Sequence, residues 1–282
     1  MTELRVGIRR TVATLGVALV AVLTVSAVHA GTLDDIKQRG KIIAGTESGL
    51  IPFEFIRDGK YAGYDVDLLH VIAEKWGVKV EHVDLPWQGI LPGLQAKKFD
   101  LVATAVTITE QRTKQVLFSV PTAEATSTLL VRKGETRFNK PEDLIGKVVA
   151  VQLNSGHHFA AKRMDERLQK EKGASVKELR TYATYAEAFL DLANNRVDAA
   201  VASMPVLSVL LKEKSGVYEM KFPIAERLYY GWAFRKEDAD LQKAVDVIFI
   251  ELKKNGTMAE LQKKWFGFTM ETPNEGFEPG KF

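Results

Sequence analysis

The chain contains no cysteine among its 282 residues. This absence excludes disulfide bridges, a catalytic thiol and lipid attachment at an amino-terminal cysteine. An excess of charge of one sign is also lacking, because 39 basic and 36 acidic residues leave a formal net charge of only +3. We therefore expect no nucleic-acid partner. A second long apolar run is missing as well, so we expect no membrane span beyond the amino terminus.

The one long apolar run lies at the amino terminus. It follows Arg9 and Arg10, covers residues 11–28, and ends in small residues that suit a signal peptidase. We interpret residues 1–30 as a signal peptide cleaved near Ala30, and expect a soluble periplasmic protein of net charge +1. The alternative, an uncleaved membrane anchor, is opposed by the marginal length of the run and by the lack of a basic stop signal.

Helix and strand patterns alternate along the rest of the chain, which predicts an α/β fold. Asp65 is expected to cap a helix that ends at Gly77, and Pro92 is expected in the first turn of a short helix. Strands are predicted at 41–45, 78–83, 99–102, 147–152 and 196–202, of which the first and the last are expected to be buried. Helices are predicted at 90–97, 141–144, 158–169, 186–194, 241–252 and 258–265.

The segment ATAVTITEQR, residues 103–112, combines three threonines and an arginine after a predicted strand end. Hydroxyls, free backbone N–H groups and the planar fork of Arg112 suit a small carboxylate, which a guanidinium binds through two hydrogen bonds. The alternative is an ordinary turn that carries a surface arginine.

An ordered series of motifs resembles the extracellular solute-binding proteins, family 3, of amino-acid ABC transporters. The series covers nearly the whole chain after the signal peptide: IPFEF (51–55), GYDVDLLHVIAEKWG (63–77), PWQGILPGLQAKKFDLVATAVTITEQR (86–112), FSVP (118–121), GKVVAVQLNSG (146–156), NNRVDAAVAS (194–203), YYGWAFRKED (229–238) and KKWFG (263–267).

The resemblance implies a two-lobed periplasmic-binding-protein fold of type II, with a mixed sheet flanked by helices in each lobe and two crossover hinge segments. A ligand would lie between the lobes, which close over it by a hinge motion. We expect lobe 1 to contain residues 31–127 and 227–270, lobe 2 to contain 128–226, and residues 271–282 to form a loose tail.

The same resemblance assigns roles on the lobe 1 side of the ligand. Arg112 matches the arginine that clamps the ligand α-carboxylate, and Thr104, Ala105 and Thr107 match positions that offer hydroxyl and backbone groups beside it. Three further positions complete this side. Phe53 and Trp87 match apolar walls, the alternative being that they are core residues, and Leu50 replaces a common stacking aromatic.

Other matches concern the polar ends of the ligand. Glu47 matches an acidic position that contacts cationic side chains, although a loop glutamate is often simply solvated. The lobe 2 loop that helps to grip the carboxylate corresponds to Asn154, Ser155 and Gly156. His157 and His158 follow, and adjacent histidines face different directions, so we expect one of them at the cleft, and neither a metal nor a cofactor.

Ser203 is the main departure from the family pattern. The family usually has an aspartate there that pairs with the ligand α-ammonium, and the neighbouring match at Asp198 supports the alignment. A hydroxyl supplies no charge, and an unpaired buried ammonium is costly. Either Glu47 takes over this role or the ligand lacks a standard α-ammonium.

We therefore expect a monomeric periplasmic protein that is not an enzyme. It would capture a polar amino acid or a related small carboxylate and deliver it to an ABC permease in the inner membrane. Two alternatives remain open: a cyclohexadienyl-type dehydratase on the same fold, for which Glu47, His157 and His158 are the available acids, and a ligand-sensing module for a membrane receptor.

Overall fold

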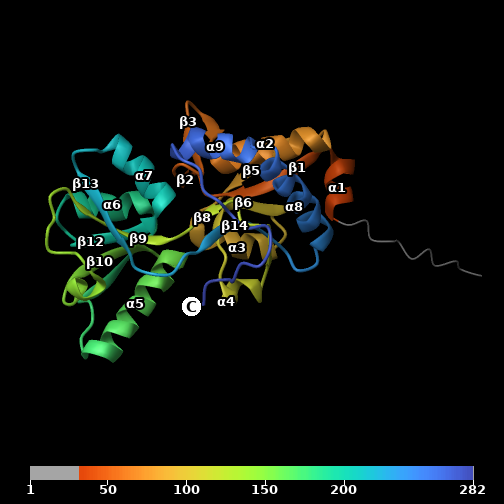
Figure 1. Cartoon of the computed structure of the whole chain (residues 1–282). Helices are drawn as coiled ribbons and strands as arrows, with labels where there is room; N and C mark the ends of the chain where they lie inside the picture. The colour runs from red at the N-terminus through yellow and green to blue at the C-terminus, as the bar shows by residue number, and fades with distance from the viewer. Residues whose placement is uncertain (1–31, 282) are drawn as a thin grey trace, which may run out of the picture.

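The computed structural model describes residues 32–281, which form two lobes, each built on its own β-sheet (Figure 1). The predicted signal peptide, residues 1–30, lies outside the described residues. The chain passes between the lobes twice, through residues 125–126 and residues 224–228, because the first and last strands of lobe 2 adjoin these segments. The predicted mixed α/β architecture with two lobes and two crossovers is confirmed, whereas the residue-level lobe boundaries stay predictions.

The sheet of lobe 1 has the order β5-β1-β6-β14-β7, with β8 paired to β14. Strands β5, β1 and β6 are parallel, and β14 is antiparallel to β6. All seven residues of β6 are buried, as expected for a strand with helices on both faces of its sheet. The strands are β1 (Lys41–Thr46), β5 (Lys79–Asp84), β6 (Leu101–Thr107), β7 (Leu117–Phe118), β8 (Ala123–Glu124) and β14 (Tyr229–Phe234).

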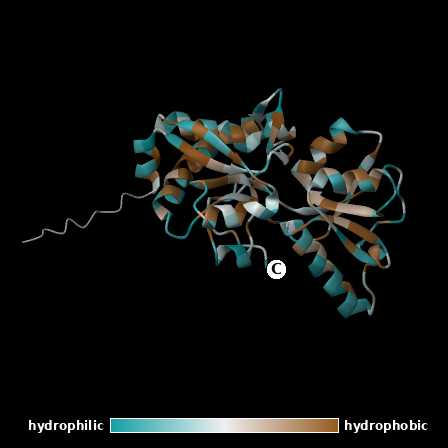
Figure 2. Cartoon of the chain, turned by 180° about the vertical axis from the view of Figure 1, so that it is seen from behind, coloured by the Kyte–Doolittle hydropathy of each residue, from teal (hydrophilic) through white to brown (hydrophobic). Residues whose placement is uncertain are grey.

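The sheet of lobe 2 has the order β11-β10-β12-β9-β13 and also mixes parallel and antiparallel pairs. Its central strands are largely apolar and buried, whereas hydrophilic residues, teal in Figure 2, lie on the surrounding helices. The strands are β9 (Ser127–Arg132), β10 (Val148–Gln152), β11 (Glu178–Tyr182), β12 (Ala199–Ser203) and β13 (Tyr218–Pro223).

Helices flank both sheets and join the parallel strands. In lobe 1, α2 and α3 both contact β6, but their buried side chains belong to separate apolar clusters. In lobe 2, α5 and α6 both contact β10 and β12, and their buried side chains also belong to separate clusters. The helices are α1 (Thr32–Arg39), α2 (Tyr64–Trp76), α3 (Trp87–Gln95), α4 (Glu110–Thr113), η1 (Pro141–Leu144), α5 (Gly156–Lys172), α6 (Tyr185–Ala193), α7 (Met204–Glu213), α8 (Ala239–Lys254) and α9 (Thr257–Phe266).

A small ribbon, β2 (Gly49–Leu50), β3 (Glu54–Arg57) and β4 (Lys60–Ala62), leads into α2 through Gly63. Gly63 has φ 137, and a Cβ there would lie 2.1 Å from the Phe53 carbonyl oxygen. A side chain is therefore excluded at this position, which lets the backbone of α2 begin directly against the ribbon.

Three local predictions were wrong. Asp65 does not cap α2, because Gly63 occupies the N-cap and the Asp65 carboxylate is buried, where it accepts a hydrogen bond from the Trp232 indole at 2.8 Å. Pro92 lies in the middle of α3, since that helix begins at Trp87. Strand β6 runs on to Thr107, so the turn before Arg112 is shorter than expected. The expected end of α2 is confirmed, because Gly77 adopts the left-handed C-cap conformation.

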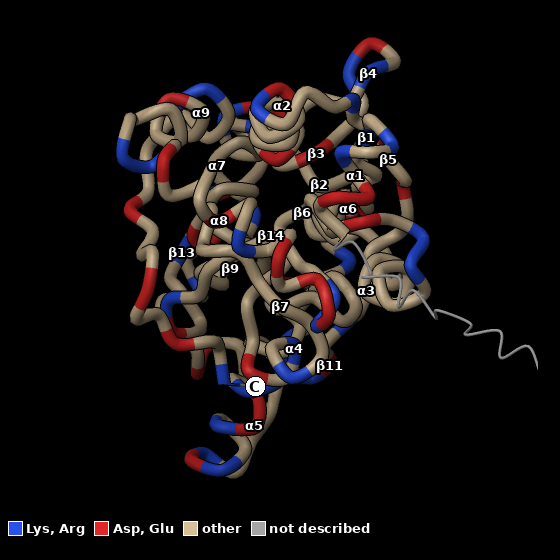
Figure 3. The backbone as a smooth tube through the Cα atoms, turned by 90° about the vertical axis from the view of Figure 1, so that its right-hand side faces the viewer, with Lys and Arg blue, Asp and Glu red and all other residues tan. Residues whose placement is uncertain are grey.

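The carboxyl-terminal segment, which we expected to be loose, makes specific contacts with lobe 1 beside α4 (Figures 1 and 3). Gly280 donates to the Ile108 carbonyl at 3.1 Å and accepts from the Glu110 N–H at 2.8 Å, which forms an isolated parallel bridge. Phe277 packs edge-on against Tyr229. These contacts attach the segment to the turn that precedes Arg112.

Candidate functional site

The candidate site lies where strand ends of the two lobes face each other. Glu47 follows β1, Arg112 follows β6, Asn154 follows β10, and Ser203 is the last residue of β12. In sheets with parallel strands, ligands bind beyond the carboxyl ends of the strands, next to the point where the strand order reverses. The topology of each lobe therefore delivers polar residues to one shared cleft.

The two lobes touch across this cleft. Helix α5 begins at Gly156, where an added Cβ would lie 2.4 Å from Thr107 Oγ1 and 2.6 Å from Thr107 Cβ in lobe 1. Gln152 Nε2 in lobe 2 donates to Glu47 Oε1 in lobe 1 at 2.7 Å. Only glycine permits the first contact without a shift of one lobe against the other.

Arg112 forms the centre of the cationic side of the site. Its guanidinium is buried, donates to the carbonyl oxygens of Thr107 and Asn154 at 2.9 Å each, and lies 5.0 Å from the ring centroid of Trp87. Burial lowers the pKa of Arg112 to about 10, so it remains a cation at neutral pH. Because Asn154 belongs to lobe 2, Arg112 links the two lobes.

The strand residues before Arg112 are all buried and offer polar groups toward the cleft. Thr107 supplies the carbonyl that orients Arg112, and Ala105 supplies only backbone. Thr104 Oγ1 has no hydrogen-bond partner within residues 32–281. A buried hydroxyl normally has a partner, so the unpartnered Thr104 Oγ1 remains a candidate ligand contact.

Glu47 carries the acidic end of the site. It is only 7% exposed, and burial raises its pKa to about 7, partly offset by the hydrogen bond from Gln152. Its second oxygen, Oε2, has no hydrogen-bond partner among the described residues. This oxygen is free to accept from a ligand.

Two further carboxyl groups lie behind Glu47, where they were not predicted. Glu54 and Asp65 are both fully buried. Burial raises the pKa of Asp65 to about 7, and burial together with the nearby Asp65 and Glu47 raises the pKa of Glu54 well above its usual value. Two buried carboxyl groups in mutual contact favour a form that shares one proton.

His157 lies at the first turn of α5 and is buried between the lobes. Its Nδ1 is 2.7 Å from Ser127 Oγ and its Nε2 is 2.8 Å from Tyr230 Oη, so both ring nitrogens have partners. Burial, and then the charge of Arg112, lower the pKa of His157 to about 3, which keeps the ring neutral. His158 points elsewhere, with its Nδ1 accepting from the Asn154 N–H at 3.2 Å.

The lobe 2 loop has a backbone role as well as a side-chain role. Asn154 adopts left-handed geometry, with φ 58, a conformation that asparagine tolerates better than most residues. Ser155 caps α5, with Oγ accepting from the His158 N–H at 3.1 Å, so its hydroxyl is already engaged. No group of three or more His, Cys, Asp or Glu residues within 32–281 is arranged to hold a metal ion.

The predicted apolar walls divide into two kinds. Phe53 is fully buried in an aromatic cluster with Tyr64, Tyr230 and Phe266, so it supports the site from the core of lobe 1. Trp87 lies at the cleft, against Arg112. Leu50 lines a cavity of 270 Å³ between the lobes, together with Tyr185, Phe189 and Val206 of lobe 2 among others.

Ser203 is fully buried at the end of β12, and its Oγ makes no hydrogen bond of normal geometry within the described residues. Its neighbour is Tyr230. Burial raises the pKa of Tyr230, and the Ser203 hydroxyl and the Arg112 cation offset part of that rise. The serine therefore faces the same space as Tyr230 and Arg112.

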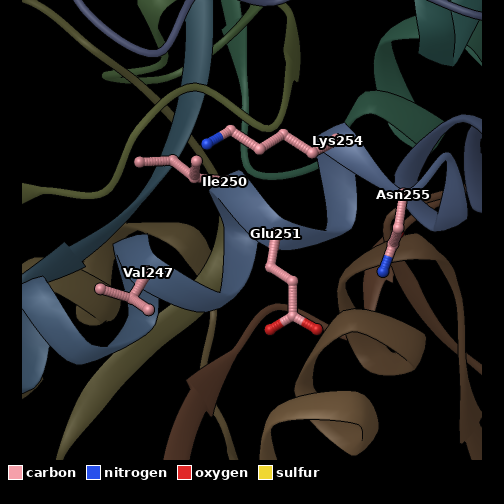
Figure 4. Close-up of a pocket in the computed structure, with 5 residues that line it drawn as sticks. All are labelled: Val247, Ile250, Glu251, Lys254 and Asn255. Carbon is pink, nitrogen blue, oxygen red and sulfur yellow. The ribbon is translucent and has the colours of Figure 1, made fainter.

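A second hollow, of about 550 Å³, lies on the outside of lobe 1 (Figure 4). One face of α8 lines it with Val247, Ile250, Glu251, Lys254 and Asn255. Glu251 is already paired with Lys75 at 2.8 Å. The hollow lacks a convergent set of polar groups from several elements, so it is not a candidate site.

Four residues at the site were missed by sequence reasoning: Gln152, Tyr185, Tyr230 and Ser127. Gln152 and Tyr230 lie within motifs that the sequence analysis used, GKVVAVQLNSG and YYGWAFRKED, and those motifs were the available signal. No local pattern marks Ser127 or Tyr185, which reach the site only through the contact of the lobes.

The chain is similar over most of its length to proteins of known class. The sequence model of the bacterial extracellular solute-binding proteins, family 3, matches residues 42–268. The L-cystine-binding protein TcyJ of Escherichia coli (strain K12) is 33% identical over 256 residues, which are 90% of this chain and 93% of that protein.

Solved structures of amino-acid-binding proteins are also similar to this chain over most of its length. The ancestral amino acid-binding protein AncCDT-1, a precursor of cyclohexadienyl dehydratase, has a TM-score of 0.75 and 37% identity, covering 83% of this chain and 99% of that chain. The arginine-bound form of truncated ArgBP from T. maritima has a TM-score of 0.68 and 33% identity, covering 78% of this chain and 99% of that chain. These likenesses confirm the predicted type II periplasmic-binding-protein fold.

Proposed function

The chain belongs to the bacterial extracellular solute-binding proteins, family 3, and from that membership we propose that it captures an amino acid or a related small carboxylate for an ABC importer. The carrying observation is Arg112, a buried cation at the meeting point of the lobes. A ligand carboxylate beside it forms charge-assisted hydrogen bonds in a site that excludes water, where such bonds are strong.

The binding event couples the lobes. Arg112 and Thr104 reach the ligand from lobe 1, while residues 154–156 and Ser203 reach it from lobe 2. A ligand that contacts both lobes favours the closed arrangement by its greater affinity for that arrangement. The permease then receives the ligand from the closed protein, which we propose acts as a periplasmic monomer.

The relatives support the proposed location and partners. TcyJ is an L-cystine-binding protein, and ArgBP was solved with arginine bound. None of the helices within residues 32–281 combines the length and apolar character that a membrane span requires. In the side of the protein that Figure 3 shows, basic and acidic residues are interspersed, without a field of one sign.

We also propose that the protein is not an enzyme. His157 is neutral and has partners on both ring nitrogens, which argues against proton donation to a substrate. Of the acids named for a dehydratase, Glu47 also lies at the cleft, and its Oε1 accepts a hydrogen bond from Gln152. Incubation with prephenate or arogenate should give no turnover; measurable dehydration would contradict this part of the proposal.

Replacement of Arg112 tests the carboxylate role. Arg112→Ala should weaken ligand binding by at least about thirtyfold in isothermal titration calorimetry, because a buried hydrogen-bonded charge contact typically contributes about 2–5 kcal/mol. Arg112→Lys keeps the charge but loses the bidentate fork, and should show an intermediate affinity. Unchanged affinity of the alanine variant for a ligand that binds the parent would refute the clamp.

A further inference from the structure

The carboxyl-terminal segment, residues 269–281, follows the part of the chain that the family model matches. Lobe 1 holds the segment well before its end. The Met270 N–H donates to Gln262 Oε1 at 2.7 Å, and Lys253 Nζ donates to the Pro273 carbonyl at 3.0 Å. The terminus then lies beside α4 (Figure 3). An anchored stretch of chain therefore reaches the turn that carries Arg112.

Gly280 binds this turn on both sides of a single residue. Its N–H donates to the Ile108 carbonyl at 3.1 Å, and its carbonyl accepts from the Glu110 N–H at 2.8 Å. The residue between these two bonds is Thr109, which faces Gly280 in the isolated parallel bridge. Both residues of the bridge are buried. The backbone of Thr109 is thus fixed from two directions.

Thr109 in turn positions Arg112. Its Oγ1 accepts from the Arg112 N–H at 3.2 Å and so caps α4, and its carbonyl accepts from the Thr113 N–H at 2.9 Å. Helix α4 has only four residues. A helix this short does not maintain itself, because a single isolated turn is unfavourable to form. The direction in which Arg112 leaves the backbone therefore depends on what holds Thr109.

A second contact of the segment reaches the strand beside this turn. The ring of Phe277 packs edge-on against Tyr229, with the ring centroids 6.2 Å apart. Tyr229 begins β14, and its carbonyl accepts from the Ile108 N–H at 2.9 Å. The next residue, Tyr230, reaches across the cleft to lobe 2, where its Oη lies 2.8 Å from His157 Nε2. The segment therefore supports two neighbouring parts of the site.

Resting on the proposed solute-binding function, we propose that residues 277–280 are a positioning element of the ligand site. Gly280 acts through Thr109 and Phe277 acts through Tyr229, so neither needs to touch the ligand. Together they keep the Arg112 guanidinium where a ligand carboxylate reaches it.

This role separates ligand affinity from the stability of the fold. Without Gly280, water replaces both of its bonds to the turn, so the net loss of hydrogen bonding is small. The apolar core of lobe 1 is unaffected, whereas the turn opens locally. The apparent Kd rises as the fraction of protein with Arg112 in place falls.

Two shortened chains that differ by two residues test the support of the turn. One ends at Lys281 and keeps both bonds of Gly280; the other ends at Pro279 and lacks them. Hydrogen exchange in the ligand-free proteins, measured by mass spectrometry, should be at least about tenfold faster over residues 109–116 in the shorter chain and unchanged over α2. Equal exchange in the two chains, or faster exchange throughout lobe 1, overturns the proposal.

Point variants test the same role in a chain of full length. Phe277→Ala should also accelerate exchange over residues 109–116, whereas the control Glu278→Ala should not, since the Glu278 side chain is 82% exposed. The melting temperatures of all four ligand-free proteins should agree within about 3 °C. A large fall in melting temperature would show a general structural role and overturn the positioning role.

L-arginine and L-cystine serve as the binding probes, because the relatives described above bind them. In calorimetry, a probe that binds the parent should bind at least about fivefold more weakly to the chain ending at Pro279 and to Phe277→Ala. The chain ending at Lys281 and Glu278→Ala should match the parent. Unchanged affinity in both test variants overturns the positioning role and leaves solute binding intact.

Failure of the proposed function has a different signature. If neither probe, and no other amino acid or small carboxylate, raises the melting temperature of the parent, solute binding by this cleft is refuted. The exchange comparison needs no ligand, so it still decides whether residues 277–280 hold the Arg112 turn.

Discussion

Gly156→Ala should hold the two lobes apart. The added Cβ would lie 2.4 Å from Thr107 Oγ1 and 2.6 Å from Thr107 Cβ, whereas ordinary contacts of this kind begin at 3.4 Å. The lobes must therefore separate by roughly 1 Å here, since the atoms that collide belong to a short, branched and buried side chain.

The size of the effect follows from the cost of overpacking. One extra methyl group in a closely packed contact costs about 1–3 kcal/mol. Because opening relieves the clash, this cost falls on the closed state alone. The closed-to-open ratio, and with it the ligand affinity, should fall about 5- to 150-fold at 1.4 kcal/mol per tenfold. The thermal stability of the ligand-free protein should change little.

Spin labels provide the assay, since a chain without cysteine can be labelled at chosen sites. Lys170→Cys in α5 and Lys243→Cys in α8 place one label on each lobe at exposed positions. Pulsed electron resonance should show a population at longer distance in Gly156→Ala than in the parent protein.

Gly216→Ala is the matched control, because a Cβ at that position meets nothing within 4 Å. It should leave both the distance distribution and the affinity unchanged. If Gly156→Ala behaves like this control, the contact between Gly156 and Thr107 does not limit closure and the reasoning is refuted.

Three further predictions concern stability. The pKa of Asp65 is raised to about 7 and that of Glu54 is also raised, so the folded state binds more protons than the unfolded state, and the free energy of unfolding should fall as pH rises from about 4.5 to 7. Glu54→Gln should reduce this slope in urea titrations by about 1.4 kcal/mol per pH unit at most; an unchanged slope would show that Glu54 does not retain its proton. Tyr230→Phe removes one partner of a buried imidazole and should destabilise the protein by about 1–3 kcal/mol in the same titrations, whereas a neutral effect would mean that the hydrogen bond contributes nothing. Gly63→Ala places a methyl group 2.1 Å from the Phe53 carbonyl oxygen and should lower the melting temperature by several degrees or prevent folding, and normal calorimetric stability would contradict this.

The alternation of helix and strand patterns predicted the α/β class, because periodicity is a local property of the chain, and the two lobes were implied by the resemblance of the ordered motifs to a known family. The prediction that Asp65 caps a helix was wrong because the capping rule assumes an exposed first turn. The Asp65 carboxylate is buried instead, and it accepts a hydrogen bond from the Trp232 indole, 167 residues away in the chain. The predicted strand at 99–102 also ended before the observed end of β6 at Thr107. Threonine and alanine at 103–107 resemble a turn in composition, but both faces of that strand are covered by the rest of lobe 1.

The sequence named the candidate site residues one by one, but it could not predict the contacts among them. Arg112 was located because its motif is contiguous, whereas its bond to the Asn154 carbonyl depends on how two lobes meet. The two adjacent histidines could not be separated by sequence. Since α5 begins at Gly156, His157 faces lobe 1 and His158 turns back toward the loop, which only the helix start determines.

The bridge between Gly280 and the turn before Arg112 bears on the order in which the protein is made. The backbone at 108–110 completes its hydrogen bonds with a residue about 170 positions later in the chain. Contacts of such long sequence separation form late in folding. The ribosome must therefore have produced nearly the entire polypeptide before this turn can make all its hydrogen bonds. In incomplete chains that end before Gly280, the turn that precedes Arg112 would lack its bonds to Gly280.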